Sequence, residues 1–318
     1  MNRRLRPMFV FGFALLIATA ALAAETSDAI PPARWGSHLF AATRLDESGP
    51  AVPDASNSKQ PKPAKPPSHC KDPTVRASSG RCFVPMLGQD IAGVFTAPAR
   101  WKAKQWGLFS AGVVGVGVVM IFDEAINTSV LHSSTPFKQD VAKVFEPFGT
   151  WGSFVVLGGF YVGGLAAHDE KARGVFYDGL AASFIASIMI TPTIKYVTGR
   201  SRPNAEMGSS DFHPFNGGAS FPSGHVTQAF AVASVVATEY KRPWVQFVCY
   251  GTASLVGYAR MLHGAHWASD VVAGALIGTG VGQAVARLNL PPRLAARHVR
   301  VTPMIGPGAQ GIMIAASF

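Results

Sequence analysis

The sequence has few charged residues. Asp, Glu, Lys and Arg together make up 14% of its 318 residues, against roughly 25% in ordinary soluble domains. Because 48% of the residues are hydrophobic and the mean hydropathy is +0.22, the composition excludes a wholly disordered chain and favours a membrane protein. Lys and Arg outnumber Asp and Glu by 28 to 18, a balance that suits phosphate groups or an anionic lipid surface.

Two further absences narrow the range of possible functions. There is no run of Lys and Arg with interleaved aromatic residues, which argues against a nucleic-acid partner. There are only three cysteines, and none has a CxxC or Cys/His metal-binding spacing, so neither a metal nor another cofactor is expected. Cys70 and Cys82 flank a short polar segment and could pair in an oxidising compartment, whereas Cys249 lies in an apolar run and is expected to be buried.

The first 24 residues resemble a secretory signal peptide. Three arginines precede an uncharged run from Met8 to Leu22, and small residues follow it, which is the order typical of such a leader. An uncleaved anchor helix is the alternative. Residues 25–82, which include the cysteine pair, are expected to be a disordered linker rich in Pro and Ser, partly in the polyproline II conformation.

Residues 83–290 are expected to be an all-α domain, a six-helix bundle that is transmembrane. Six charge-free apolar segments follow Lys104, and their Gly, Ala and Ser content suits close helix contacts in a bilayer. They are Trp106 to Phe122, Phe148 to Ala167, Gly179 to Ile194, Val226 to Thr238, Trp244 to Ala259 and Val271 to Ala286. Only the first two clearly reach the length of about 17–25 residues that a spanning helix needs, so a soluble all-α bundle is the alternative. Residues 291–318 are expected to be a tail with a β-hairpin.

Polar residues gather at the ends of three of these segments. The first cluster contains Lys195 and Arg202, the second is Pro222-Ser223-Gly224-His225, and the third contains Arg260, His266 and Asp270. Such cations neutralise charge that develops on phosphate oxygens, and a Ser-Gly helix start points backbone N–H groups at an anion. His266 and Asp270 are four residues apart and share a helix face, so the carboxylate can accept Nδ1–H and leave Nε2 as a nucleophile. His225 can then protonate the leaving oxygen and activate water.

The sequence contains three motifs in this order: Lys-x6-Arg-Pro, Pro-Ser-Gly-His and Arg-x5-His-x3-Asp. Together they resemble the motifs of the type 2 phosphatidic acid phosphatase superfamily. That superfamily includes membrane lipid phosphatases, soluble bacterial acid phosphatases and vanadium haloperoxidases, and the likeness covers about Trp106 to Leu290. It implies a phosphohistidine at His266, orientation of this histidine by Asp270, and general acid and base catalysis by His225. It also implies that the phosphate is held by Lys195, Arg202, Ser223, Gly224 and Arg260. Ala259 stands where the family usually has Ser, which affects the expected efficiency rather than the reaction class.

The predicted function is therefore that of a metal-independent phosphatase for lipid phosphate or diphosphate esters. A lipid tail can stay in the bilayer while its head group enters the site. A soluble periplasmic acid phosphatase, a vanadium haloperoxidase and a membrane scaffold without turnover are the alternatives. The identity of the lipid, the preference for mono- or diphosphate and the oligomeric state stay open.

The other polar residues near the clusters have expected roles outside catalysis. Arg200, Asp211 and His213 are expected to be solvated beside the loop that leads to Pro222. His263 is expected to face a loop or lipid head groups, and Trp267 to be an interfacial anchor.

The expected location is the bacterial inner membrane, with several spans and the site facing the periplasm. Lys and Arg are more numerous on the side opposite the clusters, which places the clusters outside the cytoplasm by the positive-inside rule. A cleaved signal peptide followed by six spans would place them inside. The two rules agree only if one short segment does not span, if Phe83 to Trp101 crosses or re-enters, or if the bundle is soluble.

Overall fold

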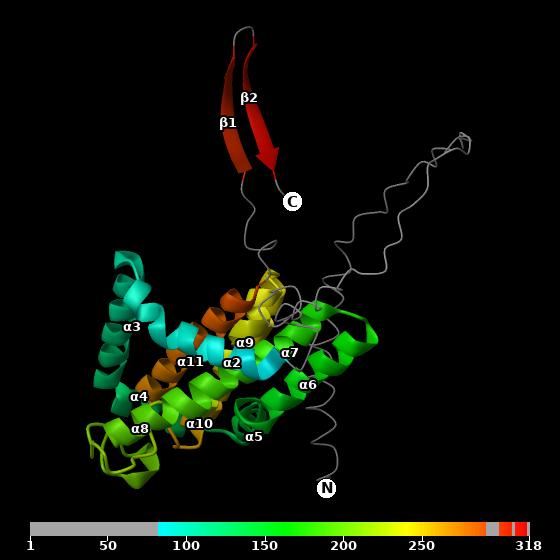
Figure 1. Cartoon of the computed structure of the whole chain (residues 1–318). Helices are drawn as coiled ribbons and strands as arrows, with labels where there is room; N and C mark the ends of the chain where they lie inside the picture. Colours follow the sequence, from blue (N-terminus) through cyan, green and yellow to red (C-terminus); the bar gives the residue numbers. More distant parts are fainter. Residues whose placement is uncertain (1–81, 291–298, 307–308, 317–318) are drawn as a thin grey trace, which may run out of the picture.

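The computed structural model describes residues 82–290, 299–306 and 309–316, the last two ranges as backbone (Figure 1). The predicted signal peptide, the linker up to residue 81 and Cys70 lie outside the described residues, while Cys82 is disulfide-bonded. Residues 82–290 fold into helices and connecting turns. The helices are α2 (Phe83–Thr96), η3 (Ala97–Arg100), α3 (Ala103–Ile121), α4 (Asp123–His132), α5 (Pro136–Phe145), η4 (Glu146–Gly149), α6 (Trp151–Ala166), α7 (Glu170–Ser183), η5 (Phe184–Ile190), α8 (Thr191–Thr198), η6 (Pro203–Ala205), α9 (Gly224–Glu239), α10 (Pro243–Leu262) and α11 (Ala268–Asn289).

Each of the six predicted apolar segments is helical, but the count of six helices is too low. The search for charge-free runs misses α4 and α5, because charged side chains occur along both helices, among them Asp123, Glu124 and Lys143. The segment from Gly179 to Ile194 is only part of a longer helix, in which the π-helical turns of η5 join α7 to α8.

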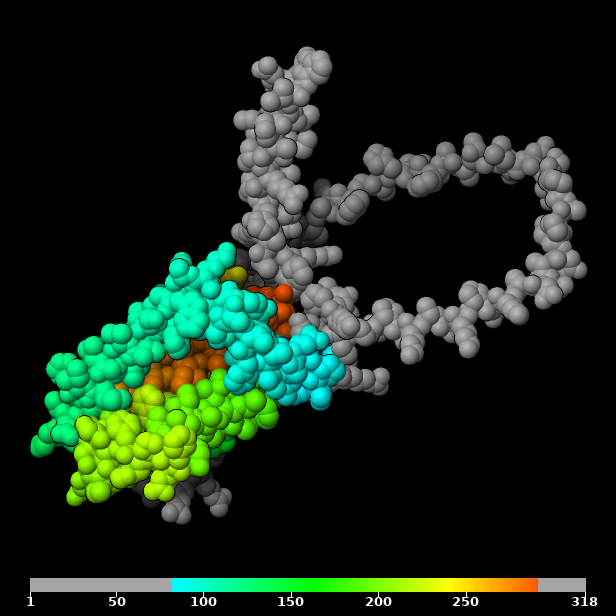
Figure 2. All heavy atoms as spheres, turned by 60° about the vertical axis from the view of Figure 1, so that its left-hand side comes forward, coloured from blue at the N-terminus to red at the C-terminus, as the bar shows by residue number. Residues whose placement is uncertain are grey.

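Within the described residues, three helices are long and apolar enough to cross a membrane: Ala103–Ile121, Glu170–Thr198 and Ala268–Asn289. A fourth candidate is the pair Pro136–Gly149 and Trp151–Ala166, which is bent by 61° at the break. Helix α3 has no buried residue and contacts α11, with Leu276 beside Gly112. In Figure 2, α11 is visible between α3 and α2. The apolar surface of α3 suits a hydrocarbon environment, and these helices fit a membrane protein rather than a water-soluble bundle.

Helices α9 and α11 are packed backbone to backbone. A Cβ atom added at Gly274, Gly278 or Gly282 would lie 2.4–2.7 Å from a carbonyl oxygen of α9 or of its N-cap residue. Glycine at every fourth position thus lets the two helices approach more closely than any other residue would allow. This contact fixes the start of α9, which carries His225, relative to the start of α11, which carries Asp270.

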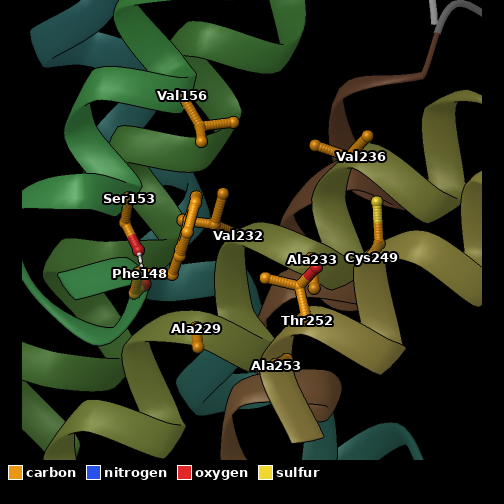
Figure 3. A pocket seen from close by; sticks show the side chains of 10 residues that line it. All are labelled: Phe148, Ser153, Val156, Ala229, Val232, Ala233, Val236, Cys249, Thr252 and Ala253. Carbon is orange, nitrogen blue, oxygen red and sulfur yellow. Dashed lines mark hydrogen bonds between the residues drawn. The ribbon is translucent and has the colours of Figure 1, made fainter. Parts of the chain in front are cut away.

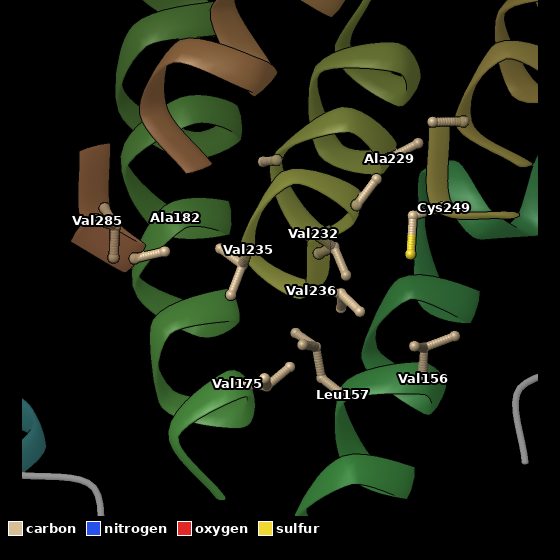
Figure 4. Packing of buried hydrophobic residues seen from close by; sticks show 14 of the residues in the cluster. Val156, Leu157, Val175, Ala182, Ala229, Val232, Val235, Val236, Cys249 and Val285 are labelled. Carbon is tan, nitrogen blue, oxygen red and sulfur yellow. The ribbon is translucent and has the colours of Figure 1, made fainter. Parts of the chain in front are cut away.

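The apolar core lies between α6, α7, α9, α10 and α11. Leu157, Val175, Val235 and Val285 contribute to it and are completely buried (Figure 4). A cavity of about 40 Å³ remains between α6, α9 and α10 (Figure 3). Cys249, which lines this cavity, is buried and has a free thiol, as the sequence predicts. The core therefore holds α9 and α10, which carry His225 and Arg260, in one rigid unit.

Two strands, β1 (Val299–Gly306) and β2 (Ala309–Ala316), occur where the sequence predicts a hairpin. They pair antiparallel, with Val299 opposite Ala316 and Gly306 opposite Ala309.

Candidate active site

The three motif clusters meet at one end of the bundle. Two backbone hydrogen bonds join them: Ser223 N donates to Asp270 O at 3.0 Å, and Ser220 N donates to Arg200 O at 3.1 Å. A third bond, from Asn204 N to Gly264 O at 3.1 Å, ties the loop after Arg202 to the turn before His266. The ends of α8 and α10 and the starts of α9 and α11 are thereby held against one another.

The pair of His266 and Asp270 is buried at the start of α11. His266 is 2% exposed and Asp270 is completely buried. The distance from His266 Nδ1 to Asp270 Oδ2 is 3.6 Å, which is an ion-pair distance and longer than a hydrogen bond. Asp270 Oδ2 instead accepts hydrogen bonds from Ser220 Oγ and, at 2.9 Å, from Trp267 N.

His225 occupies the first turn of α9 on the opposite side of the site. Burial, and after it the positive charge of Arg260, lowers the pKa of His225 to about 4. Burial also lowers the pKa of His266, against the opposing effect of Asp270. Both imidazoles are therefore neutral at pH 7, the state in which a ring nitrogen can act as a nucleophile or a base.

Four buried polar atoms of the predicted site have no hydrogen-bond partner among the described residues. They are Arg202 Nε, Ser223 Oγ, Arg260 Nε and His266 Nδ1. Unpaired buried donors are costly and are rare in folded proteins. A Cβ atom added at Gly224 would meet only Thr191, at the ordinary contact distance of 3.7 Å, so protein atoms do not crowd the N-terminus of α9. An oxyanion bound there would satisfy the donors on Arg202, Ser223 and Arg260 that the protein leaves unpaired, whereas Nδ1 of His266 lies towards Asp270.

Lys195 lies among the same residues, close enough to Asp270, Arg202 and Arg260 to interact electrostatically with them. Its Nζ donates to the carbonyl oxygens of Ala219 and, at 3.3 Å, of Ser220. The ammonium group therefore fixes the end of the loop that precedes Ser223, and still adds positive charge to the site.

Arg200 was predicted to be solvated, and this is wrong. Its side chain is completely buried and forms ion pairs at 2.7 Å with both Asp123 and Asp270. It also donates to Ser269 Oγ at 2.7 Å and twice to the carbonyl oxygen of Ser209. These bonds occupy all five N–H groups of the guanidinium, so Arg200 holds Asp270 and has no donor left for a ligand.

Asp123 was missed because it lies on α4, far from the motifs in the sequence. Its carboxylate accepts from Ser269 N at 2.8 Å, from Ser269 Oγ and from Arg200. It thus neutralises Arg200 and ties α4 to the start of α11. One signal was present in the sequence: Asp123 is the first charged residue after the apolar segment that ends at Phe122.

Glu146, on η4, is a second missed residue. Its carboxylate pairs with Arg260 through Oε1 and with His263 Nδ1 through Oε2, the latter at 3.1 Å. His263 is half-buried in this contact rather than facing a free loop. Gly149, three residues after Glu146, touches His225: a Cβ atom there would lie 2.7 Å from His225 Cβ. The segment η4 therefore closes the side of the site between His225 and Arg260.

The predictions for two further residues, Trp267 and His213, have different outcomes. Trp267 is 4% exposed and donates from Nε1 to the carbonyl oxygen of Ser201 at 2.9 Å, so the prediction of an interfacial anchor is wrong. His213 is largely exposed and lies 3.1 Å from Asp211, in the loop as expected. Within residues 82–290 no group of three His, Cys, Asp or Glu side chains is arranged to hold a metal ion.

A cavity of about 540 Å³ opens beside the site. His225 and Gly224 line one part of it, and most of the rest is lined by apolar side chains of α2, α6, α7 and η5, including Phe83, Phe154 and Leu180. Polar side chains, among them Ser183 and Gln228, also contribute. Its volume is within the range of about 300–1,000 Å³ of sites for small molecules. The polar end of the bundle thus borders a hydrophobic compartment.

Parts of the chain are similar to known proteins. Residues 177–291 match the model of the PAP2 superfamily. A lipid A 1-phosphatase of Porphyromonas gingivalis is 38% identical over 91 residues, which cover 28% of this chain and 18% of that protein. A lipid A 1-phosphatase of Rhizobium johnstonii is 28% identical over 203 residues, covering 59% of this chain and 80% of that protein. An undecaprenyl-diphosphatase of Sulfolobus acidocaldarius is 32% identical over 104 residues, covering 32% of this chain and 50% of that protein.

Proposed function

Since residues 177–291 belong to the PAP2 superfamily, we propose that this protein is a phosphatase of lipid phosphate or diphosphate esters that works through a phosphohistidine on His266 and needs no metal. The relatives named lipid A 1-phosphatase and undecaprenyl-diphosphatase support this reaction class.

The observation that carries the proposal is the set of buried, unpaired polar atoms on Arg202, Ser223 and Arg260. Arginine side chains and a hydroxyl at a helix N-terminus are suited to the equatorial oxygens of a phosphoryl group. With Lys195 they supply three positive charges, enough to stabilise the additional charge of the transition state electrostatically.

In the first step, His266 Nε2 attacks phosphorus, the P–N bond forms, and the bond from phosphorus to the lipid oxygen breaks. His225 donates a proton to the departing oxygen, so the lipid leaves as an alcohol or, from a diphosphate, as a monophosphate. Asp270, with its charge fixed by Arg200, stabilises the imidazolium.

In the second step, His225 removes a proton from water, the oxygen attacks phosphorus, and the P–N bond breaks to release inorganic phosphate. Because the pKa of His225 is lowered to about 4, the imidazole is neutral at pH 7 and can accept this proton. A bound phosphate brings negative charge close to His225, which offsets Arg260 and favours the protonated form required in the first step.

The cavity of about 540 Å³ supports a lipid as the substrate. It leads from His225 along an apolar wall, where a hydrocarbon chain gains free energy by leaving water. The apolar candidate spans support a bilayer setting for this compartment, which is where lipid phosphates are found.

The test is release of inorganic phosphate by the full chain in detergent from phosphatidate, a lipid A-type phosphate and a polyprenyl diphosphate, with and without a chelator. Turnover with chelator present is expected. His266→Ala should abolish it, and Asp270→Asn should leave weak activity because the amide keeps a polar group but loses the charge. His132→Ala, on the exposed end of α4, is the matched control. Failure on every lipid, or full activity of His266→Ala, would refute the proposal.

Vanadate gives an independent test. A trigonal-bipyramidal vanadate bonded to His266 resembles the species at phosphoryl transfer, and Arg202 and Arg260 would hold its equatorial oxygens. Inhibition is expected, weakened about tenfold or more in Arg202→Ala, a loss equivalent to about 1.4 kcal/mol. Unchanged activity in millimolar vanadate would contradict the role given to these arginines.

We further propose that the catalytic end faces the periplasm of an inner-membrane protein. The opposite end carries basic residues at two places, Lys171 and Arg173 in the first turn of α7 and Lys241 and Arg242 between α9 and α10, which by the positive-inside rule favours the cytoplasm for that end. A cysteine at the exposed Ser210, in a chain lacking the native thiols, should react with a membrane-impermeant reagent in cells whose inner membrane is intact. Labelling only after inner-membrane lysis would reverse the orientation.

A further inference from the structure

One wall of the 540 Å³ cavity carries a strip of polar side chains among apolar ones. Gln228 on α9, Ser183 on α7 and Ser187 on η5 all line the cavity. Gln228 Nε2 donates to Ser183 Oγ at 2.8 Å, and Ser187 Oγ donates to Gln228 Oε1 at 2.9 Å. Gln228 and Ser183 are 5% and 3% exposed. The two serines therefore fix the plane of the Gln228 amide in an otherwise hydrophobic compartment.

The fixed amide retains hydrogen-bonding capacity. A glutamine nitrogen carries two hydrogens, and the bond to Ser183 uses one of them. A site that buries such a group discriminates strongly against a ligand that offers it no partner, because the desolvated N–H is then left unpaired. The π-helical turns of η5, which bring Ser187 and Ile188 to the cavity, are a local distortion often found at functional sites.

The position of Gln228 relates the strip to the reacting phosphate. Gln228 follows His225 by three residues on α9, so both lie on the same face of the helix and about 4.5 Å apart along its axis. In an acylated glycerol or sugar phosphate, an ester or amide carbonyl lies a few bonds from phosphorus. In a polyprenyl phosphate, the corresponding atoms are hydrocarbon.

We propose that Gln228, held by Ser183 and Ser187, is a specificity-determining residue that donates to the ester or amide carbonyl next to the phosphate of an acylated lipid. The preferred substrates are then acyl-linked lipid phosphates rather than polyprenyl phosphates. This inference rests on the phosphatase function proposed above and names the substrate class of that site.

The test compares kcat/KM for phosphatidate and for a polyprenyl phosphate in the same detergent, with the parent protein, Gln228→Leu and Phe154→Leu. The parent should prefer phosphatidate at least tenfold. Gln228→Leu should lose about tenfold on phosphatidate, mainly through KM, and keep or gain activity on the polyprenyl phosphate. Phe154→Leu, which changes an apolar part of the same wall, should affect both substrates alike.

Two outcomes would overturn the inference. The first is a parent enzyme that prefers the polyprenyl phosphate, and the second is an equal fall in kcat/KM on both lipids in Gln228→Leu. A binding measurement that needs no turnover distinguishes failure of the inference about Gln228 from failure of the proposed phosphatase function. Diacylglycerol should raise the melting temperature of the parent more than farnesol does, and Gln228→Leu should not distinguish the two. If the parent released no phosphate from either lipid, the proposed function would fall, and equal shifts by the two alcohols in the parent would overturn the role of Gln228.

Discussion

The two ends of the helical bundle both bury carboxylates, but they hold them in different ways. At the catalytic end, Asp123 and Asp270 are bridged by a guanidinium that uses all its donors. At the other end, Asn289 Nδ2 donates to Asp178 Oδ1 at 2.8 Å and to Asp90 Oδ2 at 3.2 Å. The charged guanidinium of Arg200 fixes both the position and the electrostatic environment of Asp270. The neutral amide of Asn289 joins α2, α7 and α11 without adding a charge.

The difference suggests that the two ends of the bundle have different roles. Charge at the end that holds the proposed site acts on His266 and therefore on reactivity, and the hydrogen bonds of Asn289 at the opposite end act on packing. Substitutions at the first end should then change activity and stability together, and those at the second end should change only stability.

The largest effect is expected from Arg200→Ala. The change leaves two buried carboxylates without their cation, and breaking a buried ion pair in this way costs about 3–5 kcal/mol. Activity should be lost and the protein should melt at a much lower temperature in a thermal scan of the purified protein. A variant with near-parental melting and turnover would show that Arg200 does not hold Asp270.

Asp123→Asn should have the next largest effect. Arg200 then acts on Asp270 alone and weakens the support that Asp270 gives to the imidazole of His266, so kcat/KM should fall about tenfold, equivalent to about 1.4 kcal/mol. The acid limb of the pH profile should move to lower pH, because His266 becomes less basic. The groups facing the two histidines are Asp270, Lys195, Arg202, Arg260 and Glu146.

Asp140→Asn, which removes an exposed carboxylate paired with Lys143, is the control and should change neither quantity. A loss of turnover in Asp123→Asn with an unmoved pH profile would indicate a purely structural role for Asp123.

Asn289→Leu probes the opposite end. It removes two hydrogen bonds from buried carboxylates, so stability should fall by about 1–3 kcal/mol, while kcat on the best lipid phosphate stays at the parental value. Melting temperature and turnover measured on the same preparation check this. A kcat loss as large as that of Asp123→Asn would show that the two ends are coupled and would break the comparison.

The smallest effect is expected from pH. Because the pKa of His225 is lowered to about 4 in the folded protein and an unfolded histidine titrates near 6.5, the unfolded state binds more protons between these values. Its contribution to stability is complete above about pH 6.5 and is lost as pH falls towards 4. Between pH 7.5 and 5.0, the parent should lose about 2–4 °C more in melting temperature than His225→Ala, the shift that about 1 kcal/mol gives. Equal losses would contradict a buried, neutral His225.

The spacing of the motif residues predicts part of their local geometry. The Ser223-Gly224 pair marks the start of α9, as the sequence predicts. The expectation that His266 and Asp270 share a helix face is wrong, because His266 lies in the bend before the N-cap Trp267 and only Asp270 lies in the first turn of α11. The apolar segments identify helices. What these patterns cannot contain is the partner of a buried side chain that lies far away along the chain.

Asp123 and Glu146 illustrate this limit. Asp123 contacts Arg200 across 77 residues, and Glu146 contacts Arg260 across 114. Charge alone made Arg200 look solvated, because an arginine is buried only when specific acceptors surround it. The prediction that Arg200 is solvated and the count of six helices are wrong for the same reason. The charged segment that follows the first apolar run folds into the bundle.

The glycine contacts between α9 and α11 have a mechanical consequence. Where backbone touches backbone, the spacing of the two helices is set by atoms that cannot be compressed or change rotamer. Lateral pressure from a surrounding bilayer is then absorbed by tilting of the whole unit and by displacement of the peripheral α3, which has no buried residue. The separation of His225 and Asp270, at the starts of these two helices, should therefore depend little on the thickness and tension of a membrane.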